Sequence, residues 1–450
     1  MKKITRRNFV KNMGIGALAI NYIPFSVRGS NVPSNKLNIA AVGIGGMGGA
    51  NLRMLENENI VALCDVDFNY AANTIKRYPN AKLYKDFRVM LEKEKNVDAV
   101  LIATPDHTHA VITMAAMQEG KHVYCQKPLT HNIYEARTIT EKAKYYGVQT
   151  QMGNQGHSWE HIRVLKEWIN DGAIGEVKEV HAWTDRPVGG DPWSTFLIKA
   201  LPTEKVEKPD GMDWDLWIGP ARYRDYHPDY HPTKWRSWLD FGTGSLGDMG
   251  CHIIDPAFWA LDLGAPISIE ATSTHWEPEI ESQTFPRASI VRYNFPANEK
   301  RNSIKLTWYD GRLQPPIPEE LEPGRTIPAS GAFIIGEKGV IMHGSHGADN
   351  VRIIPETKMK EYKLPAKTIP RIEGSHEDDW VRACKEGKNG TPACSNFDYG
   401  GPLTEMALLG MIAIQVKNQN LIWNAKEMKF ENNDAANNLI KTEYRQGWKL

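Results

Sequence analysis

A glycine-rich turn directly after an apolar segment is the feature that most limits what this chain can fold into. The residues from Leu37 read LNIAAVGIGGMGG, so the apolar segment runs into Gly43-x-Gly45-x-x-Gly48, and a helical pattern follows. A second apolar segment ends at Asp65, 22 positions after Gly43. A turn between a strand and a helix, with an acidic residue at the end of the next strand, is typical of the dinucleotide-binding α/β fold.

Each part of this pattern has a physical task. Gly43 permits the tight turn, Gly45 lets the backbone approach a pyrophosphate, and Gly48 lets the helix pack closely on the strand. The helix N-terminus offers free N–H groups and a positive dipole to the phosphates. Asp65 can accept both ribose hydroxyls and would repel a 2′-phosphate, which favours NAD over NADP. The predicted cofactor contacts at this turn are Gly43, Ile44, Gly45, Gly46, Met47, Gly48 and Asp65.

Short apolar segments alternate with helical periods over residues 36–155, and this alternation predicts a doubly wound parallel sheet with helices on both faces. Two polar segments, ATPDHTHA and CQKPLTHN, follow later strands of this sheet. The carboxyl edge of such a sheet is where ligands bind. The Lys-Pro turn fixes Lys127 where it can reach both the nicotinamide ribose and a substrate. The further cofactor contacts that we predict are Thr104, Pro105, His109, Gln126 and Lys127.

The pattern changes after residue 155. A helical segment is followed by longer strands with alternating polarity, and a loop-rich segment spans roughly residues 187–247. Residues 156–450 are therefore predicted to form an α+β domain with a large, open, mostly antiparallel sheet. A C-terminal helix from about residue 404 could pack back on the first domain. The predicted fold class is α/β, with an N-terminal Rossmann domain and this C-terminal α+β domain.

Asp248 and His252 lie four positions apart in GDMGCHIIDPAFW, a spacing that places both on one face of a helix, with Asp255 on roughly the same stripe. Removal of hydride from an alcohol carbon requires a base for the hydroxyl proton, and a neutral imidazole suits this task. A helix cap formed by Asp248, or a buried histidine with satisfied hydrogen bonds, would explain the same residues without chemistry. A zinc site that includes His227 and His231 is a further alternative. Nothing in the first domain requires a metal, and none is predicted.

Five segments together resemble the glucose–fructose oxidoreductase / inositol dehydrogenase (Gfo/Idh/MocA) family over essentially the whole chain after residue 33: GIGGMG, CDVD, ATPDHTHA, QKPLTHN and GSLGDMGCHIIDPAFWALDLG. The resemblance implies an NAD-dependent oxidoreductase in which Lys127, Asp248 and His252 surround the reacting C–OH of a sugar, glycoside or polyol. We expect His252 to act as the base and Lys127 to polarise the oxygen of the reacting C–OH. Asp248 is expected to be an orienting or relaying group. The family usually has Glu-Lys-Pro, whereas this chain has Gln126-Lys127-Pro128, so the lysine lacks its usual anionic neighbour.

Seven of the fourteen tryptophans lie between Trp183 and Trp259, interspersed with tyrosines, histidines and arginines. Aromatic faces with polar edges suit a pyranose, which presents C–H faces and a belt of hydroxyls. The same side chains could instead pack on one another or on a neighbouring subunit. The predicted substrate contacts are Asn154, His157, Tyr226, His227, Tyr230, His231 and Arg236.

The first 33 residues have the charge pattern of an export signal. The heptapeptide TRRNFVK at residues 5–11 closely resembles a twin-arginine signal, and a short, weakly apolar segment follows. That pathway exports folded proteins, often with a cofactor bound. We therefore predict that residues 1–33 are a signal peptide and that the protein is periplasmic. A basic, unstructured start of a cytoplasmic protein is the alternative.

This predicted compartment restricts the chemistry, because the periplasm maintains no pool of NAD. An exported enzyme should keep its cofactor and restore it in each cycle, for example by oxidising one substrate and reducing a second. A glycoside hydrolase or lyase that oxidises a ring carbon transiently is one alternative, and a non-catalytic sugar-binding protein with structural NAD is another.

Charge and hydropathy also bear on partners. The formal net charge is zero and no run of about 20 apolar residues occurs, so neither nucleic-acid binding nor a membrane span is predicted. The family resemblance implies a homo-dimer or homo-tetramer.

Overall fold

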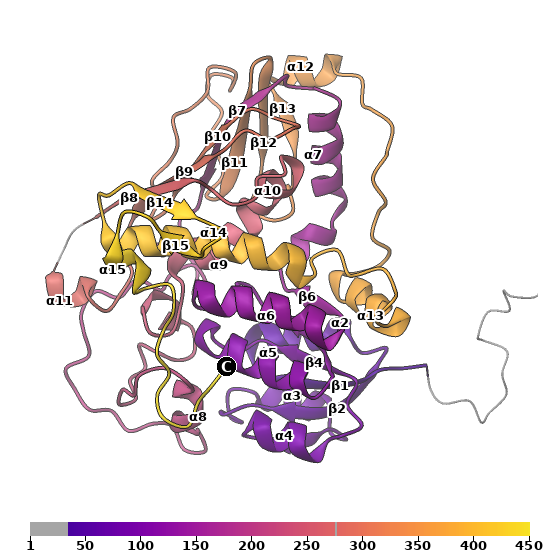
Figure 1. The fold of residues 1–450 in the computed structure, drawn as a ribbon, viewed down its shortest axis with the longest axis vertical. Helices are drawn as coiled ribbons and strands as arrows, with labels where there is room; N and C mark the ends of the chain where they lie inside the picture. The colour runs from indigo at the N-terminus through magenta and orange to yellow at the C-terminus, as the bar shows by residue number, and fades with distance from the viewer. Residues whose placement is uncertain (1–34, 275–276) are drawn as a thin grey trace, which may run out of the picture. The chain divides into compact units, whose positions relative to one another are not determined.

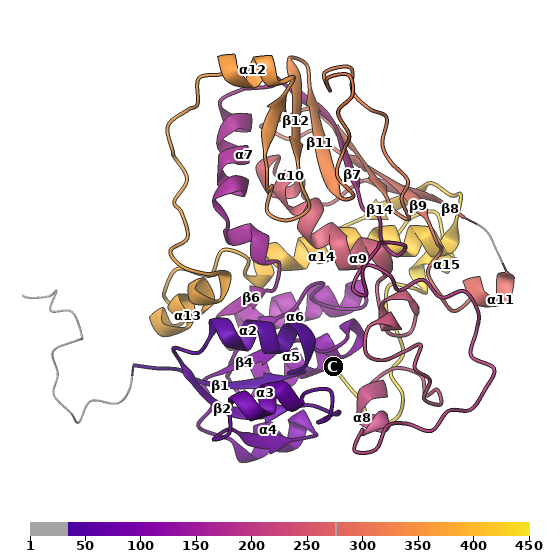
Figure 2. The same ribbon diagram turned by 180° about the vertical axis from the view of Figure 1, so that it is seen from behind.

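Two β-sheets organise the part of the chain that the computed structural model describes, residues 35–274 and 277–450 (Figures 1 and 2). Residues 37–450 belong to one unit, so the contacts between the two sheets are defined. The predicted signal peptide at residues 1–33 lies outside the described residues and stays a prediction. No helix among the described residues combines the length and the apolar character that a membrane crossing requires.

The first sheet has six parallel strands in the order β3-β2-β1-β4-β5-β6, which confirms the predicted doubly wound architecture. The order reverses beside β1, and this reversal creates the switch point at which ligands bind in such sheets. The strands are β1 Asn38–Val42, β2 Asn59–Cys64, β3 Lys82–Tyr84, β4 Ala99–Ile102, β5 His122–Cys125 and β6 Thr150–Met152. The helices between them are α2 Gly46–Met54, α3 Ala72–Arg77, α4 Phe87–Lys93, α5 Asp106–Gln118 and α6 Ile133–Tyr146.

Both faces of this sheet are covered, as the nearly continuous apolar strands require. Alternate residues of β1 enter two different cores: Ala40 and Val42 pack with α4, α5 and α6, whereas Ile39 and Ala41 pack with α2. The second core also takes in Trp380 from α13, His376–Glu386. A helix from the C-terminal half of the chain therefore completes one face of the N-terminal sheet.

The second sheet has nine strands in the order β13-β12-β11-β7-β10-β9-β8-β14-β15. Every neighbouring pair is antiparallel except β7 with β10, so the prediction of a large, mostly antiparallel sheet is confirmed. The strands are β7 Val177–Trp183, β8 Ser268–Ser273, β9 Ser289–Phe295, β10 Ile304–Tyr309, β11 Gly331–Gly336, β12 Gly339–His343, β13 Arg352–Ile354, β14 Leu421–Asn424 and β15 Lys429–Phe430. The other helices are η2 Gln155–Ser158, α7 Glu160–Asn170, α8 Trp214–Ile218, η3 Lys234–Ser237, α9 Gly244–Ile253, α10 Asp255–Ala260, α11 Pro278–Glu281, α12 Glu356–Glu361, α14 Phe397–Val416 and α15 Asp434–Asn437.

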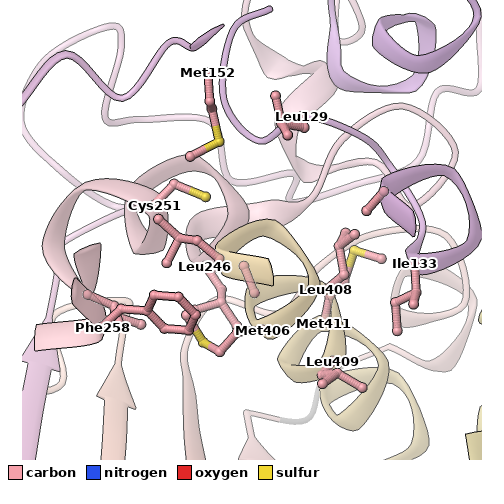
Figure 3. Close-up of a cluster of buried hydrophobic side chains, with 14 of the residues drawn as sticks. Leu129, Ile133, Met152, Leu246, Cys251, Phe258, Met406, Leu408, Leu409 and Met411 are labelled. Atoms are coloured by element: carbon pink, nitrogen blue, oxygen red, sulfur yellow. The ribbon is translucent and has the colours of Figure 1, made fainter. Parts of the chain in front are cut away.

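Helix α14 packs between the two sheets, against α6 on one side and against β8 and α9 on the other (Figures 1 and 2). It includes the segment from Thr404 for which the sequence predicts a helix. Met406 and Leu408 of α14, Leu129 from the first half and Leu246 from α9 belong to one buried cluster (Figure 3). Helix α9 carries Asp248 and His252, so this core fixes both residues relative to the parallel sheet.

The loop-rich segment between β7 and α9 forms a small core of its own. Trp214 and Trp217 of α8 stack on each other, and Tyr230, Trp238 and Phe241 pack around them. The isolated bridge between Asp67 and Met212 ties this core to the loop after β2. The segment thereby covers the carboxyl edge of the parallel sheet.

Candidate active site

A cavity of about 500 Å³ opens at the carboxyl edge of the parallel sheet and is also lined by residues of the second half of the chain. It contains the turns that follow β1, β2, β4 and β5, together with one face of α9. Sequence reasoning predicted fourteen of its lining residues: Gly43, Gly45, Gly46, Met47, Asp65, Thr104, Pro105, His109, Gln126, Lys127, His231, Arg236, Asp248 and His252.

The glycine turn forms a tight cradle at one end of the cavity. Gly43 has φ +76°, and a Cβ on it would lie 2.7 Å from the carbonyl carbon of Ala103. A Cβ on Gly48 would collide with the carbonyl oxygen of Gly43, which shows how closely α2 approaches β1. Helix α2 begins without a side-chain cap, so its first N–H groups are available to an anion. Ile44 and Gly48, which we predicted as cofactor contacts, do not line the cavity and instead shape the turn.

Asp65 organises this turn. Its Oδ2 accepts hydrogen bonds from the backbone N–H groups of Ile44 (2.8 Å) and Gly45 (3.3 Å), and its Oδ1 accepts one from Asp67 (2.9 Å). Burial raises the pKa of the carboxyl group, and these three hydrogen bonds act in the opposite direction. Since a carboxylate has about four acceptor sites, these bonds leave little capacity for the two ribose hydroxyls that we assigned to Asp65. Asp65 therefore positions the turn as well as facing the cavity.

His109 ties together the two polar segments that follow β4 and β5. Its Nδ1 lies 2.8 Å from the carbonyl oxygen of Pro128 and its Nε2 lies 2.8 Å from that of Thr104. Burial opposes protonation of the ring, but Cys125 and the two carbonyl groups raise the pKa of His109 overall. Because both ring nitrogens are engaged with the backbone, His109 acts on the cavity by positioning these segments.

Gln126 takes part in a buried chain of hydrogen bonds that reaches α13. Its Nε2 donates to Asn51 Oδ1 (2.9 Å), and Asn51 Nδ2 donates to Glu377 Oε1 (2.7 Å). Tyr124 also donates to Glu377. The carboxylate in this buried chain is therefore that of Glu377 from α13, and position 126 supplies a neutral amide.

Lys127 and Asp248 form a direct ion pair in the centre of the cavity. The Lys127 Nζ donates to Asp248 Oδ1 (2.9 Å) and to the Asp248 carbonyl oxygen (2.6 Å). Arg186 and Arg236 also donate to the same carboxylate. Burial alone would raise the pKa of Asp248, but the three cations hold it well below its ordinary value. Thr243, not Asp248, occupies the N-cap position of α9, so the alternative in which Asp248 is a helix cap is wrong.

His252 lies one helical turn after Asp248 and lines the same cavity. Its side chain is buried, and its Nδ1 has no hydrogen-bond partner among the described residues. Its ring packs against that of His346, with 4.3 Å between the ring centroids. Burial, His346 and Lys127 together lower the pKa of His252 well below that of a free imidazole. The ring of His252 is therefore neutral and has an unsatisfied nitrogen, so His252 is not a buried histidine with satisfied hydrogen bonds.

Five of the predicted substrate contacts do not line the cavity. His157 bonds Asp255 through Nδ1 (2.9 Å), and Tyr399 of α14 donates to the same carboxylate. Asn154 is fully buried and accepts a hydrogen bond from Ser395. Both side chains are therefore engaged with protein partners. The remaining three residues belong to the aromatic core of the loop-rich segment or to its edge: Tyr226, His227 and Tyr230.

His231 and Arg236 are the two predicted substrate contacts that do line the cavity. His231 Nε2 lies 3.3 Å from Asp67 Oδ2, and Arg236 packs its guanidinium over Trp235, 4.3 Å from the ring centroid. The described residues contain no group of three His, Cys, Asp or Glu side chains suited to a metal ion. His227, one of the alternative zinc ligands, is also outside the cavity lining.

Sequence reasoning missed several lining residues because no local pattern marks them. Arg186 lies 62 positions before the carboxylate that it contacts. Tyr70 packs over Gly45, and Trp193 approaches Gly46. His346 reaches the cavity from the segment between β12 and β13. These four residues come to the site only through long-range packing.

Two models of one oxidoreductase family match the chain. The model described as "Oxidoreductase family, NAD-binding Rossmann fold" matches residues 37–154, and that described as "Oxidoreductase family, C-terminal alpha/beta domain" matches residues 160–293. Together they cover more than half of the chain.

Individual relatives are more distant. A myo-inositol 2-dehydrogenase of Thermotoga maritima is 29% identical over 143 residues, which are 31% of this chain and 42% of the relative. A D-glucoside 3-dehydrogenase of Escherichia coli is 25% identical over 248 residues, 54% of this chain and 59% of the relative. The chain thus spans about half the length of the curated relatives that it matches.

The fold also matches solved structures. An inositol dehydrogenase homologue from Azotobacter vinelandii, in complex with NADH and myo-inositol, superposes with a TM-score of 0.56 at 16% identity. The match covers 87% of this chain and 98% of that one, so the two proteins share the complete two-sheet fold. From the two family models and this shared fold, the chain belongs to the Gfo/Idh/MocA oxidoreductase family, whose N-terminal domain is an NAD-binding Rossmann fold.

Proposed function

We propose that this protein is an NAD(H)-dependent oxidoreductase that acts on a hydroxyl group of a sugar, glycoside or polyol. The observation that carries the proposal is that Lys127, Asp248 and His252 line the same cavity as the glycine turn. The named relatives include dehydrogenases of inositol and of a glucoside, which supports this substrate class.

The residues around the glycine turn fit a dinucleotide. The uncapped start of α2 offers its first N–H groups to a pyrophosphate. Gly45 and Gly46 let the rings of Tyr70 and Trp193 lie close to the same turn, where a Cβ would collide with Tyr70. Bound NAD would supply the hydride acceptor. Asp65 lies at the end of β2, where the adenosine ribose is bound in this fold.

Each of the three residues has a separate task in moving the hydroxyl proton. His252 is held neutral, so its imidazole can accept the proton from the substrate O–H as that bond breaks. Lys127 uses two of its donors on Asp248, and an ammonium group has three, so one remains for the substrate oxygen. Asp248 fixes the direction of the lysine. With NAD bound as the hydride acceptor, loss of this proton would convert the alcohol to a ketone or aldehyde.

The test is to incubate the purified protein with a panel of sugars, glycosides and polyols while following the absorbance of reduced nicotinamide and the formation of keto-sugar. We expect at least one member to give both signals. Silence across the panel, with bound NAD intact, would contradict the proposal. Release of an aglycone that depends on NAD would indicate a glycosidase, and tight sugar binding without a spectral change would indicate a binding protein.

We also propose that the protein is exported through the twin-arginine pathway and keeps its cofactor. The support is the sequence TRRNFVK at residues 5–11. A reporter fused to residues 1–36 should reach the periplasm, and replacement of Arg6 and Arg7 by lysine should block this. Mass spectrometry of ligand released from native protein should detect NAD. A reporter that stays in the cytoplasm would contradict the proposed export. A protein purified without nucleotide would contradict the proposed retention of the cofactor.

The family resemblance supports a homo-dimer or homo-tetramer as the working assembly. Light scattering on the purified protein measures its mass directly. A monomeric mass at micromolar concentration would contradict this part of the proposal.

A further inference from the structure

Positive charge is concentrated around one carboxylate of the cavity, beside the reacting centre. Lys127, Arg186 and Arg236 all contact the single carboxylate of Asp248. Their side chains retain exposures of 13%, 21% and 16%, whereas that of Asp248 is 4% exposed. The anion is therefore enclosed by its partners, and the three cations still face the cavity.

Among the described residues, these three cations form no ion pair with any other carboxylate. Asp106, which also lines the cavity, accepts a hydrogen bond from Thr243 with its Oδ2 (2.6 Å). Asp65 is bound to backbone N–H groups at the glycine turn. Asp185 and Asp191 act on the charge of Arg186 without forming an ion pair with it. In direct contact, three cations therefore share one carboxylate.

Arg186 has hydrogen-bonding capacity to spare. One of its terminal nitrogens donates to Asp248, and within residues 35–274 and 277–450 no acceptor is found for its Nε or for its second terminal nitrogen. A guanidinium group has five N–H donors in a planar fork, whose geometry matches a carboxylate. Asp248 satisfies one side of this fork, and the unpaired donors on the other side of a partly buried guanidinium are costly to leave without an acceptor.

Arg186 lies at the imidazole end of the cavity. After burial and its nearest charged neighbours, its charge contributes to the lowered pKa values of His252 and of His346. By contrast, the charge of Arg236 acts on Tyr70, which packs over the glycine turn. In the geometry, Arg186 contacts Oδ2 of Asp248, whereas Lys127 and Arg236 share Oδ1. Arg236 also lies 5.9 Å from the ring of Trp193, which approaches Gly46 of the glycine turn. The free donors of Arg186 therefore remain for a substrate.

We propose that the substrate carries a carboxylate, as a sugar acid or its glycoside does, and that Arg186 binds this carboxylate through its free guanidinium donors. This inference rests on the proposed function for the identity of the site. It narrows the substrate class from sugars in general to acidic sugars.

The test compares matched pairs of ligands that differ only in a carboxylate replacing a hydroxymethyl group: the methyl glycosides of glucose and glucuronate, of galactose and galacturonate, and of mannose and mannuronate. Binding to the NAD-loaded protein is measured by calorimetry, and hydride transfer is followed separately. We expect the acid of at least one pair to bind roughly tenfold or more tightly than its neutral partner. This preference should shrink as ionic strength rises.

Two variants make the test specific. Arg186→Gln should lower the ratio of acid to neutral affinity about tenfold or more, because it removes both the charge and the fork. Arg222→Gln removes the same charge from an exposed residue outside the cavity, and it should leave the ratio unchanged.

The possible results separate the inference from the proposed function. The inference is overturned if no pair shows a preference for the acid, if Arg186→Gln retains the preference, or if the sugar 6-phosphates bind more tightly than the uronates. It is also overturned if Arg186→Gln weakens NADH binding and leaves the acid-to-neutral ratio intact. Hydride transfer from neutral sugars alone would support the proposed function and contradict the inference. Selective binding of acids without hydride transfer would support the inference and contradict the proposed function.

Discussion

His252 is a buried histidine with an unsatisfied ring nitrogen. His107, His109 and His376 each engage both ring nitrogens with protein partners. Among the described residues, Nδ1 of His252 and Nε2 of His343 are buried without a partner. An unmade hydrogen bond of this kind costs about 1–3 kcal/mol. Of these two residues, His252 lines the cavity and His343 does not, so the imidazole of His252 is the one that a substrate hydroxyl can meet.

We predict that His252→Ala lowers the rate of hydride transfer by roughly 10²–10⁴, the usual contribution of a positioned acid–base group. The affinity for NADH should stay unchanged, since the glycine turn and Asp65 are not altered. Single-turnover reduction of bound NAD and an NADH titration measure the two effects. His161→Ala, at an exposed position of α7, is the matched control. Unchanged turnover in His252→Ala would refute the assignment of the base.

The protonation state of His252 gives a prediction about pH. Burial, His346 and Lys127 lower its pKa well below 6.5, and only the neutral ring can accept a proton. The active form therefore persists as the pH falls through the range where a free imidazole becomes charged. We expect the acid limb of kcat/KM to have its midpoint below about pH 6.5. A midpoint at or above that value would show that a different group, or an unperturbed histidine, acts as the base.

At the scale of elements, the contact between β1 and α2 depends on the lack of a side chain at Gly48. A Cβ there would collide with the Gly43 carbonyl oxygen, and because that oxygen belongs to the backbone, α2 would have to shift. We predict that Gly48→Ala lowers the free energy of unfolding by about 1–3 kcal/mol and weakens NADH binding. Urea unfolding and an NADH titration measure these effects. Gly190→Ala, at an exposed position where a Cβ meets nothing within 4 Å, should change neither quantity. Equal behaviour of the two variants would contradict this account of the turn.

The junction of β5 with α13 yields a prediction about Gln126. Asn51 accepts from Gln126 with its oxygen and donates to Glu377 with its nitrogen. A glutamate at position 126 would place a carboxylate oxygen against the oxygen of Asn51, and neither atom can donate a hydrogen bond. The new carboxylate would also lie near Glu377, whose pKa is already raised by burial. We expect Gln126→Glu to lower the free energy of unfolding by about 1–3 kcal/mol.

The loss in Gln126→Glu should depend on pH with a definite sign. Burial would raise the folded-state pKa of the new carboxyl group above its unfolded value. The destabilisation should therefore be small near the unfolded pKa and should grow as the pH rises through the folded-state pKa. Gln118→Glu, at an exposed position of α5, makes the same change in charge and is the control. A loss that is the same in both variants, or that shrinks with rising pH, would contradict the hydrogen-bond chain as described.

The elements that the sequence predicted well are those whose residues interact locally. The β1–α2–β2 unit and helix α9 are marked by spacings of a few residues, so Gly43, Asp65, Asp248 and His252 could be assigned from the chain alone. The placement of Arg186 could not, because its backbone is held by Gly311 and its side chain by Asp248, both far away in sequence. The aromatic residues near Tyr230 suited both a sugar and a core, and only packing distinguishes these roles.

At the scale of the whole described unit, the cavity depends on segments that are distant in the chain. Helix α14 packs on α6 and α9, α13 completes the core beside α2, and the loop-rich segment bridges to Asp67. These contacts hold Lys127, from the first half, against Asp248, from the second. A ligand that touches both halves should therefore stabilise residues 37–450 as one unit, since binding to the folded state alone adds to the free energy of unfolding.

This linkage gives a prediction about cofactor choice. NADH at about 100 times its dissociation constant should add about 2.7 kcal/mol to the free energy of unfolding and raise the Tm accordingly. NADPH at the same concentration should raise the Tm less, because its 2′-phosphate would approach the buried carboxylate of Asp65. Asp65→Ser should narrow the difference between the two cofactors by removing this repulsion, although it also loses the hydrogen bond from the Ile44 N–H. Asp225→Ser, at an exposed position outside the cavity, removes the same charge and should preserve the difference. Equal Tm shifts with NADH and NADPH in the unaltered protein would contradict the role given to Asp65, because no other carboxylate is tied to the glycine turn within the described residues.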